Sequence, residues 1–438
     1  MMATELGIPQ AVEMGVLPPD FSPTPGRDVR ADHDKLIREM GAAGTVLLKN
    51  VNNTLPLKAP KYLGIFGNDA GEVTQGFYRP TQPPNDVNTG TLVVGGGSGT
   101  GRATYIVSPL ETLKTRGREV GAEVQYVTDN NVLAANAFQG VYPPPEICVV
   151  FQQTFASESF DRLEWELDGN STAVINNVAD YCGNTIVVTH SGGVNTMPWA
   201  DNPKIGAILA AHYPGQESGN SIADLLWGDV APSGRLPYTI PNTTENTGPP
   251  IVNLTRPVGD PLAWQADFTE GQLIDYRHYD ANGIEPLYEF GFGLTYTTFA
   301  IDRDELAVSL LVHEPVAAQP NPAVEVEVGG HPELWEDVLA VKVQVSNTGD
   351  VAAHAVPQLY VSFPEGCPQG TPVKVLRGFE KVLVEAGESE EVEFRLMRRD
   401  LSVWNTDEGD WVIPVGEFAF RVGFSSRDLP AESKFAVI

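Results

Sequence analysis

The sequence predicts two folds in series: a mainly parallel α/β domain, followed by an all-β sandwich. From about Asp32 to Ile240, apolar runs alternate with helical patterns, which is typical of βαβ units. From about Leu339 onward, short segments of alternating polarity are separated by turn residues, as in antiparallel sheets. Residues 242–261, between the two patterns, are rich in Pro, Thr, Asn and Gly and indicate a linker or long surface loop.

The α/β part contains short apolar runs that read as strands and longer segments with helical spacing. The expected strands are Leu63–Gly67, Glu123–Val127, Ile147–Phe151, Thr185–Thr189 and Ile205–Ala210. The expected helices are Pro109–Arg116, Ser171–Tyr181 and Glu217–Leu226. Ser108 before Pro109, with Glu111 three residues after the serine, predicts a capped helix start.

The all-β part spans about 100 residues, the size of an immunoglobulin- or fibronectin-type sandwich. Its expected strands are Leu339–Ser346, Val356–Phe363, Val382–Leu383, Glu390–Leu396 and Gly416–Gly423. Turns are expected at Asn347–Gly349 and at Ala386–Gly387. The predicted domain bounds are 32–245 for the α/β domain, 246–335 for a linker and connecting segment, and 336–438 for the sandwich.

Charge excludes several classes of partner. The 438 residues carry 28 Lys plus Arg against 57 Asp plus Glu, a formal net charge of -29. Such a surface repels the phosphate backbone of nucleic acids and anionic membranes, so neither is an expected partner. An uncharged ligand such as a sugar meets no such penalty.

The glycine-rich stretch Gly95–Gly101 does not match a known phosphate-binding pattern. No Lys-Ser/Thr pair closes it as in a P-loop, and the G-x-G-x-x-G spacing is absent. It does not satisfy G-x-S-x-G either, so it is not a nucleophile elbow. A strained or closely approached backbone is the better interpretation, and the sequence indicates no cofactor.

Cysteines and histidines indicate no metal site. Cys148, Cys182 and Cys367 show no zinc-like spacing and allow at most one disulfide; Cys148 and Cys182 are interpreted as small buried hydrophobic residues. The seven histidines form no i, i+4 pair and none lies beside a cysteine cluster. His212, directly after an expected strand, is a candidate to line a cleft.

The sequence gives mixed signals about export. Its first residues lack a basic region followed by an apolar one, and no apolar run reaches the ~18 residues of a membrane span. Four glycosylation sequons nevertheless point to a secretory history, and they begin at Asn52, Asn170, Asn242 and Asn253.

The segment Phe155–Arg162 is the strongest candidate for chemistry. It closely follows the expected strand Ile147–Phe151, where open parallel sheets place their ligand crevice. Flanking Phe155 and Phe160 predict a raised pKa for Glu158, which would suit it to protonate a leaving group. Two structural interpretations remain open: an i, i+4 ion pair of Glu158 with Arg162, or an Asp161-Arg162 clamp.

The same segment resembles the Gly-Glu-Gly-Tyr/Phe-Asp-Arg segment of family 3 glycoside hydrolases, with Ser-Glu-Ser in place of Gly-Glu-Gly. The resemblance is collinear over nearly the whole chain. Further family-like segments are Asp32–Leu57, Thr91–Thr100, Thr185–His190, Pro214–Asn220, Gly228–Val230, Ser233–Pro237, Glu270–Gly271, Ile274–Arg277, Tyr288–Phe299 and Arg377–Lys381.

The resemblance implies a retaining hydrolase with two carboxyl groups ~5 Å apart. Glu158 maps onto the family's acid/base, with Glu164 and Glu166 as weaker alternatives. The family's nucleophile is an Asp of an N-terminal barrel, in a Ser-Asp-Trp context that these residues do not contain. Residues 1–31 are then expected to be the remnant of the connection between barrel and sandwich.

The family further implies a secreted β-glucosidase of fungal type that releases terminal β-D-glucose from β-glucosides or cello-oligosaccharides during cellulose breakdown. Related alternatives are a β-xylosidase or an N-acetyl-β-glucosaminidase. Two others belong to different classes: a non-catalytic carbohydrate-binding or interaction module, and a half-enzyme completed by a barrel on another chain.

Overall fold

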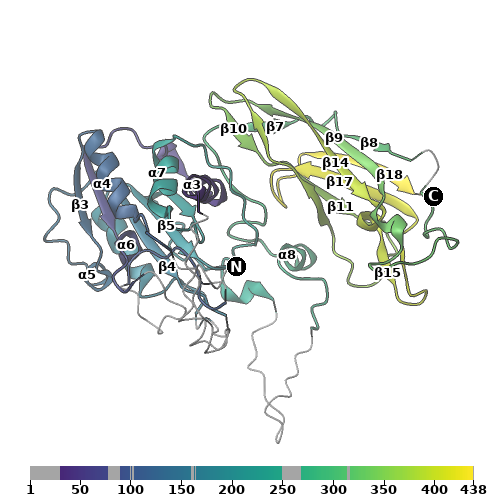
Figure 1. Cartoon of the computed structure of the whole chain (residues 1–438), viewed down its shortest axis with the longest axis horizontal. Coiled ribbons are helices and arrows are strands. Elements are labelled where there is room, and N and C mark those ends of the chain that lie inside the picture. Colours follow the sequence, from purple (N-terminus) through teal and green to yellow (C-terminus); the bar gives the residue numbers. More distant parts are fainter. Residues whose placement is uncertain are drawn as a thin grey trace, which may run out of the picture. The chain divides into compact units, whose positions relative to one another are not determined.

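The computed structural model describes residues 30–76, 89–98, 100, 103–158, 162, 164–248, 268–312 and 316–437. The chain forms two compact units, Met1–Val230 and Ala231–Ile438 (Figure 1). This division falls before the expected bound at residue 245; the bounds 32–245, 246–335 and 336–438 stay predictions. None of the described helices combines the length and apolarity needed to cross a membrane.

The first unit is built on a six-stranded sheet in the order β1-β6-β5-β4-β2-β3. Its strands are β1 (Val46–Asn50), β2 (Tyr62–Phe66), β3 (Glu123–Val127), β4 (Ile147–Thr154), β5 (Thr185–Ser191) and β6 (Ile205–Ala210). Strands β2 to β6 are parallel, and β1 pairs antiparallel with β6 at the edge. The chain steps outward from β2 to β3 and in the other direction from β4 to β6, so the topological switch lies between β2 and β4.

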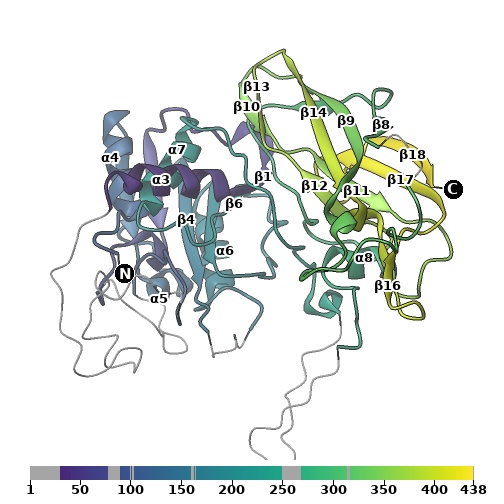
Figure 2. The same cartoon turned by 45° about the vertical axis from the view of Figure 1, so that its right-hand side comes forward.

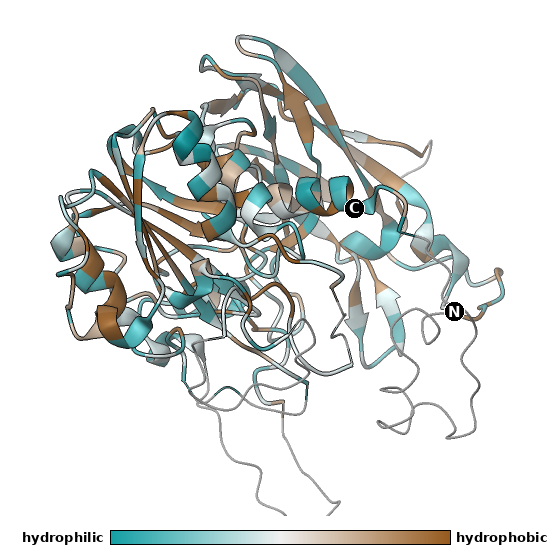
Figure 3. Cartoon of the chain, turned by 60° about the vertical axis from the view of Figure 1, so that its left-hand side comes forward, coloured by the Kyte–Doolittle hydropathy of each residue, from teal (hydrophilic) through white to brown (hydrophobic). Residues whose placement is uncertain are grey.

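Helices in two packed groups accompany this sheet. They are α3 (His33–Gly44), α4 (Pro109–Glu119), α5 (Asn130–Ala134), α6 (Ser171–Tyr181) and α7 (Ser218–Trp227). Helix α7 packs against α3 and α4, while α5 packs against α6 (Figure 2). The central strands are mostly hydrophobic and the helices are mixed in polarity, as expected for strands buried on both faces (Figure 3). The predicted cap is confirmed, because the Ser108 hydroxyl accepts a hydrogen bond from the Glu111 N–H at 3.2 Å.

The second unit contains an all-β sandwich, as predicted. One sheet has the order β12-β11-β17-β18; the other has the order β14-β9-β7, with β8 also paired to β9. Both sheets contribute side chains to a single hydrophobic core. The strands are β7 (Phe299–Ile301), β8 (Ala307–Leu310), β9 (Asp337–Asn347), β10 (Ala353–Ala355), β11 (Gln358–Ser362), β12 (Val375–Phe379), β13 (Val382–Val384), β14 (Ser389–Met397), β15 (Val403–Asn405), β16 (Asp410–Val412), β17 (Gly416–Gly423) and β18 (Ala431–Val437).

Part of the expected connecting segment belongs to this sandwich. Strands β7 and β8 both pair antiparallel with β9, so residues 299–301 and 307–310 of the expected connecting segment take part in the sheet. Helix α8 (Tyr276–Asn282) also precedes the first sandwich strand. The sequence did not indicate β7 and β8, because two strands of only three and four residues carry little alternation of their own.

The predicted burial of Cys148 and Cys182 is confirmed, and the two residues also form the single disulfide that the sequence allowed. Cys148 lies on β4 and Cys182 at the end of α6, with Cα atoms 6.2 Å apart. Cys367, the remaining cysteine, is free and half-buried. The disulfide links the end of α6 to the central strand β4.

Replacing both Cys148 and Cys182 by alanine should lower the free energy of unfolding by about 4 kcal/mol, since the bridge closes a loop of 34 residues. Urea unfolding followed by circular dichroism measures the change. Cys367→Ala is the matched control and should change stability by less than about 1 kcal/mol. Equal stability of the double variant and the wild type would contradict the bridge.

Candidate active site

The strand ends of the first unit place the candidate residues on one edge of the sheet. Strands β2, β4, β5 and β6 run parallel, so their carboxyl ends share that edge. Asn68 and Asp69 follow β2, and the segment Phe155–Glu158 follows β4. Because β2 and β4 flank the topological switch, both segments lie where open α/β sheets bind their ligands.

Glu158 lies at the tip of the segment after β4 with its side chain exposed to solvent. Its Oε2 accepts a hydrogen bond from the backbone N–H of Ser98 at 2.7 Å. Two further backbone contacts hold the glycine-rich stretch alongside: the Gly96 N–H donates to the Ala156 carbonyl at 2.9 Å, and Gly96 forms a parallel bridge with Ser157. The two motifs that the sequence singled out separately are therefore one structural element.

Close approach of the backbone explains the glycines, as the sequence had suggested. Gly97 has a φ of +87°, and a Cβ added there would meet the Cβ of Glu158 and lie 2.9 Å from its Oε2. A Cβ on Gly95 would lie 2.9 Å from the ring of Tyr213 and 3.0 Å from the Ala156 carbonyl oxygen. Side chains at these positions would push the loop away from Glu158.

The prediction of a raised pKa for Glu158 was wrong. Hydrogen bonds from the Ser98 side chain and backbone lower the pKa of this carboxyl, and its exposure leaves almost no opposing desolvation. Phe155 is only half-buried, and Phe160 lies outside the described residues. Within this chain Glu158 is accordingly held as a carboxylate.

Two side chains fix the backbone that leads to Glu158. The Asp168 carboxylate accepts a hydrogen bond from the Phe155 N–H at 2.9 Å. The Tyr213 hydroxyl accepts one from the Ala156 N–H at 3.1 Å and donates to the Thr154 carbonyl at 3.4 Å. Burial raises the pKa of both Asp168 and Tyr213. Neither residue was predicted, since each acts through a backbone amide that only the folded loop presents.

A buried polar chain connects the turn after β2 with the rest of this edge. Asp69 accepts a hydrogen bond from the Leu92 N–H at 2.8 Å through Oδ1, and its Oδ2 lies 2.7 Å from His190 Nδ1. His190 Nε2 lies 3.3 Å from the Ser218 hydroxyl at the start of α7. All three side chains are almost completely buried, which excludes a substrate from the serine. Asp69 thus anchors the chain just before the glycine-rich stretch.

The alternatives to Glu158 occupy different surroundings. Glu164 is exposed, and Glu166 accepts a hydrogen bond from the Thr172 hydroxyl at 2.6 Å on α6. Arg162 donates to the Val194 carbonyl at 2.7 Å and to the Glu164 carbonyl at 3.4 Å, whereas the Glu158 carboxylate faces Ser98. The arrangement favours neither Glu164 nor Glu166, and it departs from the Glu158–Arg162 ion pair. Asp161, the other half of the suggested clamp, lies outside the described residues.

The other candidates lie apart from this element. His212 has a φ of +55° and hydrogen-bonds to the backbone of Gly44 at the end of α3, and burial lowers its pKa.

Among the described residues, no group of three or more His, Cys, Asp or Glu side chains is arranged to hold a metal ion. Three sequon asparagines, Asn52, Asn170 and Asn242, are exposed; Asn253 lies outside the described residues.

Comparison with known families identifies the fold. Residues 45–296 match the glycosyl hydrolase family 3 C-terminal domain, and residues 355–426 match a fibronectin type III-like domain. The chain belongs to glycosyl hydrolase family 3. The predicted family resemblance and the order of the two folds are thereby confirmed.

Named relatives and solved structures agree with this assignment. The chain is 51% identical over 419 residues to "Probable beta-glucosidase G" of Aspergillus flavus, covering 94% of this chain and 50% of that protein. It is 40% identical over 416 residues to "Probable beta-glucosidase M" of Aspergillus oryzae, covering 93% and 52%. The solved beta-D-glucoside glucohydrolase from Trichoderma reesei is 34% identical with a TM-score of 0.82, covering 95% of this chain and 57% of that one. The family 3 chain thus spans about half the length of the curated relatives it matches.

Gly97→Ala should separate the glycine-rich stretch from Glu158, because the new Cβ would occupy the position of the Glu158 side chain. Gly121→Ala is the matched control: Gly121 also has positive φ, +76°, but no atom within 4 Å of the added Cβ. In both variants the left-handed backbone should lower the free energy of unfolding by about 1–2 kcal/mol. Gly97→Ala should lower it further, because its Cβ also clashes with Glu158. Equal losses in urea unfolding would contradict the close approach.

The contact between Ser98 and Glu158 should persist as the pH is lowered through 4.5, the ordinary pKa of a glutamate, because the folded-state pKa is depressed. It should be lost only as the pH falls through that lower pKa, when the carboxyl becomes protonated. The amide chemical shift of Ser98, followed by NMR with labelled serine, reports this titration. Glu158→Gln should abolish it, and a Ser98 transition at or above pH 4.5 would contradict the assignment.

Proposed function

We propose that this chain supplies the acid/base carboxyl of a retaining β-glucosidase that releases terminal β-D-glucose from β-glucosides and cello-oligosaccharides. The observation that carries the proposal is the position of Glu158: an exposed carboxylate at the topological switch, held by the backbone of a glycine-rich stretch. The names of the relatives and solved structures support the substrate class. The nucleophilic carboxylate would come from residues outside these 438.

The reaction needs Glu158 in two protonation states. In the first step, the outside carboxylate attacks the anomeric carbon, the bond to the leaving oxygen breaks, and Glu158 gives that oxygen its proton. In the second, Glu158 takes a proton from water while the water oxygen attacks the anomeric carbon and displaces the enzyme carboxylate. Glu158 ends the cycle protonated, as it began.

The surroundings of Glu158 are suited to half of this cycle. The hydrogen bonds from Ser98 favour the carboxylate that the second step requires. The first step requires the acid, and a second carboxylate about 5 Å away would raise the pKa of Glu158 by repulsion between the two charges. The nucleophilic carboxylate would therefore raise the pKa of Glu158, while the hydrogen bonds from Ser98 lower it.

We further propose that the protein is secreted, glycosylated and active in cellulose breakdown. The Cys148–Cys182 disulfide is typical of proteins folded in an oxidising compartment. Exposed sequons at Asn52, Asn170 and Asn242 present side chains that an oligosaccharyltransferase can reach.

Hydrolysis of an aryl β-glucoside tests the proposal. The chain should be inactive by itself and active when co-expressed with the half of the Aspergillus flavus relative that it does not match. In that pair, Glu158→Gln should lower kcat/KM for a poor leaving group by about 10²–10⁴-fold and should remove the alkaline limb of the pH profile. With an aryl glucoside whose good leaving group needs no acid, the second step becomes limiting, and added azide, which needs no general base, should restore part of the turnover.

Glu164→Gln and Glu166→Gln serve as matched controls, because they remove a nearby carboxylate without touching the Ser98 contact. Each should retain activity within about threefold of the wild type. Turnover by the 438-residue chain without a second half would show that the nucleophile lies within it. An active pair whose kcat/KM is unchanged by Glu158→Gln would remove Glu158 from the acid/base role.

A further inference from the structure

The sandwich contains a cavity of about 550 Å³ that the proposed glucosidase chemistry does not use. Its walls come from α8, β12, the turn after β14 and the hairpin β15–β16, all in the second unit. Six of the sixteen lining residues are aromatic or cationic: Phe363, Trp404 and Trp411, with Arg277, Arg377 and Arg399. Such a combination differs from the rest of a chain whose net charge is -29.

The three arginines lack ion-pair partners within the part of the chain that the structure describes. Arg277 contacts the Tyr276 hydroxyl at 3.4 Å, and the Arg377 Nε donates to the Asp400 carbonyl at 2.8 Å. Arg399 stacks over the Trp335 ring at 4.9 Å. Other arginines of the chain do pair with carboxylates, namely Arg38, Arg116, Arg395, Arg398, Arg421 and Arg427.

The acid in the cavity wall is already engaged. Asp400 Oδ2 accepts a hydrogen bond from the Met397 N–H at 2.9 Å. The Asp400 carboxylate is not within ion-pair distance of any of the three described arginines, although its charge acts on Arg377 and Arg399. The terminal nitrogens of the guanidinium groups consequently retain donors for an anionic ligand.

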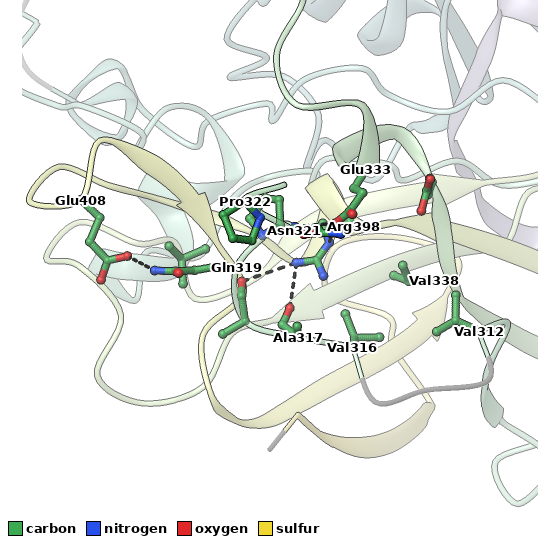
Figure 4. A pocket seen from close by; sticks show the side chains of 14 residues that line it. Val312, Val316, Ala317, Gln319, Asn321, Pro322, Glu333, Val338, Arg398 and Glu408 are labelled. Atoms are coloured by element: carbon green, nitrogen blue, oxygen red, sulfur yellow. Dashed lines mark hydrogen bonds and ion pairs between the residues drawn. The ribbon is translucent and has the colours of Figure 1, made fainter. Parts of the chain in front are cut away.

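A second cavity in the same unit provides the contrast (Figure 4). There Arg398 donates to the Ala317 carbonyl at 2.8 Å and lies 4.0 Å from Glu333, while Gln319 donates to Glu408. Its cation and amide are thus satisfied by the protein itself, and its wall adjoins residues 313–315, which the structure does not describe.

Two tryptophans form an aromatic surface in the same cavity as the arginines. Trp404 on β15 and Trp411 on β16 are directly paired across the hairpin, with ring centroids 5.7 Å apart at 72°. Trp404 is 47% exposed, although burial of an indole is favourable. The faces of such rings stack on the apolar face of a pyranose or on another flat ring.

We propose that this cavity binds a saccharide that carries a carboxylate, such as a uronic acid residue. The carboxylate would accept hydrogen bonds from Arg277 and Arg377, for which the planar guanidinium is the matching donor. The sugar ring would stack on Trp404. Amide and hydroxyl groups on the rim, on Gln272, Gln369, Thr371 and Thr406, suit the ring hydroxyls better than they suit a purely aromatic acid.

Isothermal titration of the 438-residue chain tests the proposal without any use of glycosidase activity. The probes are an aldobiouronic acid with a terminal glucuronate, cellobiose as its neutral counterpart, and 4-hydroxycinnamate as an aromatic carboxylate. The acidic disaccharide should bind at least about tenfold more tightly than either other probe. Its affinity should fall as salt is raised, because the contacts are ionic.

Arg277→Gln and Trp404→Ala should each weaken binding of the acidic disaccharide by about tenfold or more, and Trp404→Phe by less. Arg395→Gln, which removes an equal charge on β14 outside the cavity, is the control and should bind as the wild type does. Thermal melts confirm that each variant is folded. Equal affinity for cellobiose, preference for 4-hydroxycinnamate, or unchanged binding in folded Arg277→Gln and Trp404→Ala would overturn the proposal.

Discussion

The geometry of the candidate active site depends on the buried carboxylate of Asp69. One of its oxygens binds the backbone N–H of Leu92 and the other meets His190 on β5, so a single side chain joins three segments that are distant in sequence. In a site with almost no solvent exposure, both contacts are strong and leaving either unmade is costly. The position of the glycine-rich stretch follows from this anchor.

Backbone contacts of the glycine-rich stretch then fix the position of Glu158. Gly95 and Gly97 allow the stretch to lie against the segment after β4, and Ser98 then donates to the Glu158 carboxylate. Asp168 and Tyr213 hold the backbone of the same segment. Because Asp168 and Tyr213 bind main-chain groups, substitution of Glu158 removes its charge and the Ser98 contact but leaves these two supports in place. These contacts hold the loop that carries Glu158 in one position, which the proposed acid/base role requires.

The central strands of the parallel sheet could be predicted from the sequence because they are buried, mainly apolar runs, whereas the edge strand β3 is partly exposed and was predicted from its alternating polarity. The expected segments at Glu123–Val127 and Ile205–Ala210 coincide with β3 and β6. Strand β1 was not predicted as a strand, since its antiparallel pairing with β6 is decided by tertiary contacts. Sequence reasoning also selected Glu158 and the glycine-rich stretch, but as separate features. Their contact, the lowered pKa of Glu158, and the roles of Asp69, Asp168 and Tyr213 arise only when the strand ends meet.

Hydrogen exchange, measured by mass spectrometry on an Asp69→Ala variant, tests most directly whether this anchor imposes the geometry of the site. Our account predicts faster exchange in residues 89–98 and in 155–158, with the amides of β3 as protected as in the wild type. Asp180→Ala, which removes an exposed carboxylate paired with Lys204, is the control and should leave both segments unchanged. Unaltered exchange at 155–158 in folded Asp69→Ala protein would contradict the claim that Asp69 holds the stretch that positions Glu158.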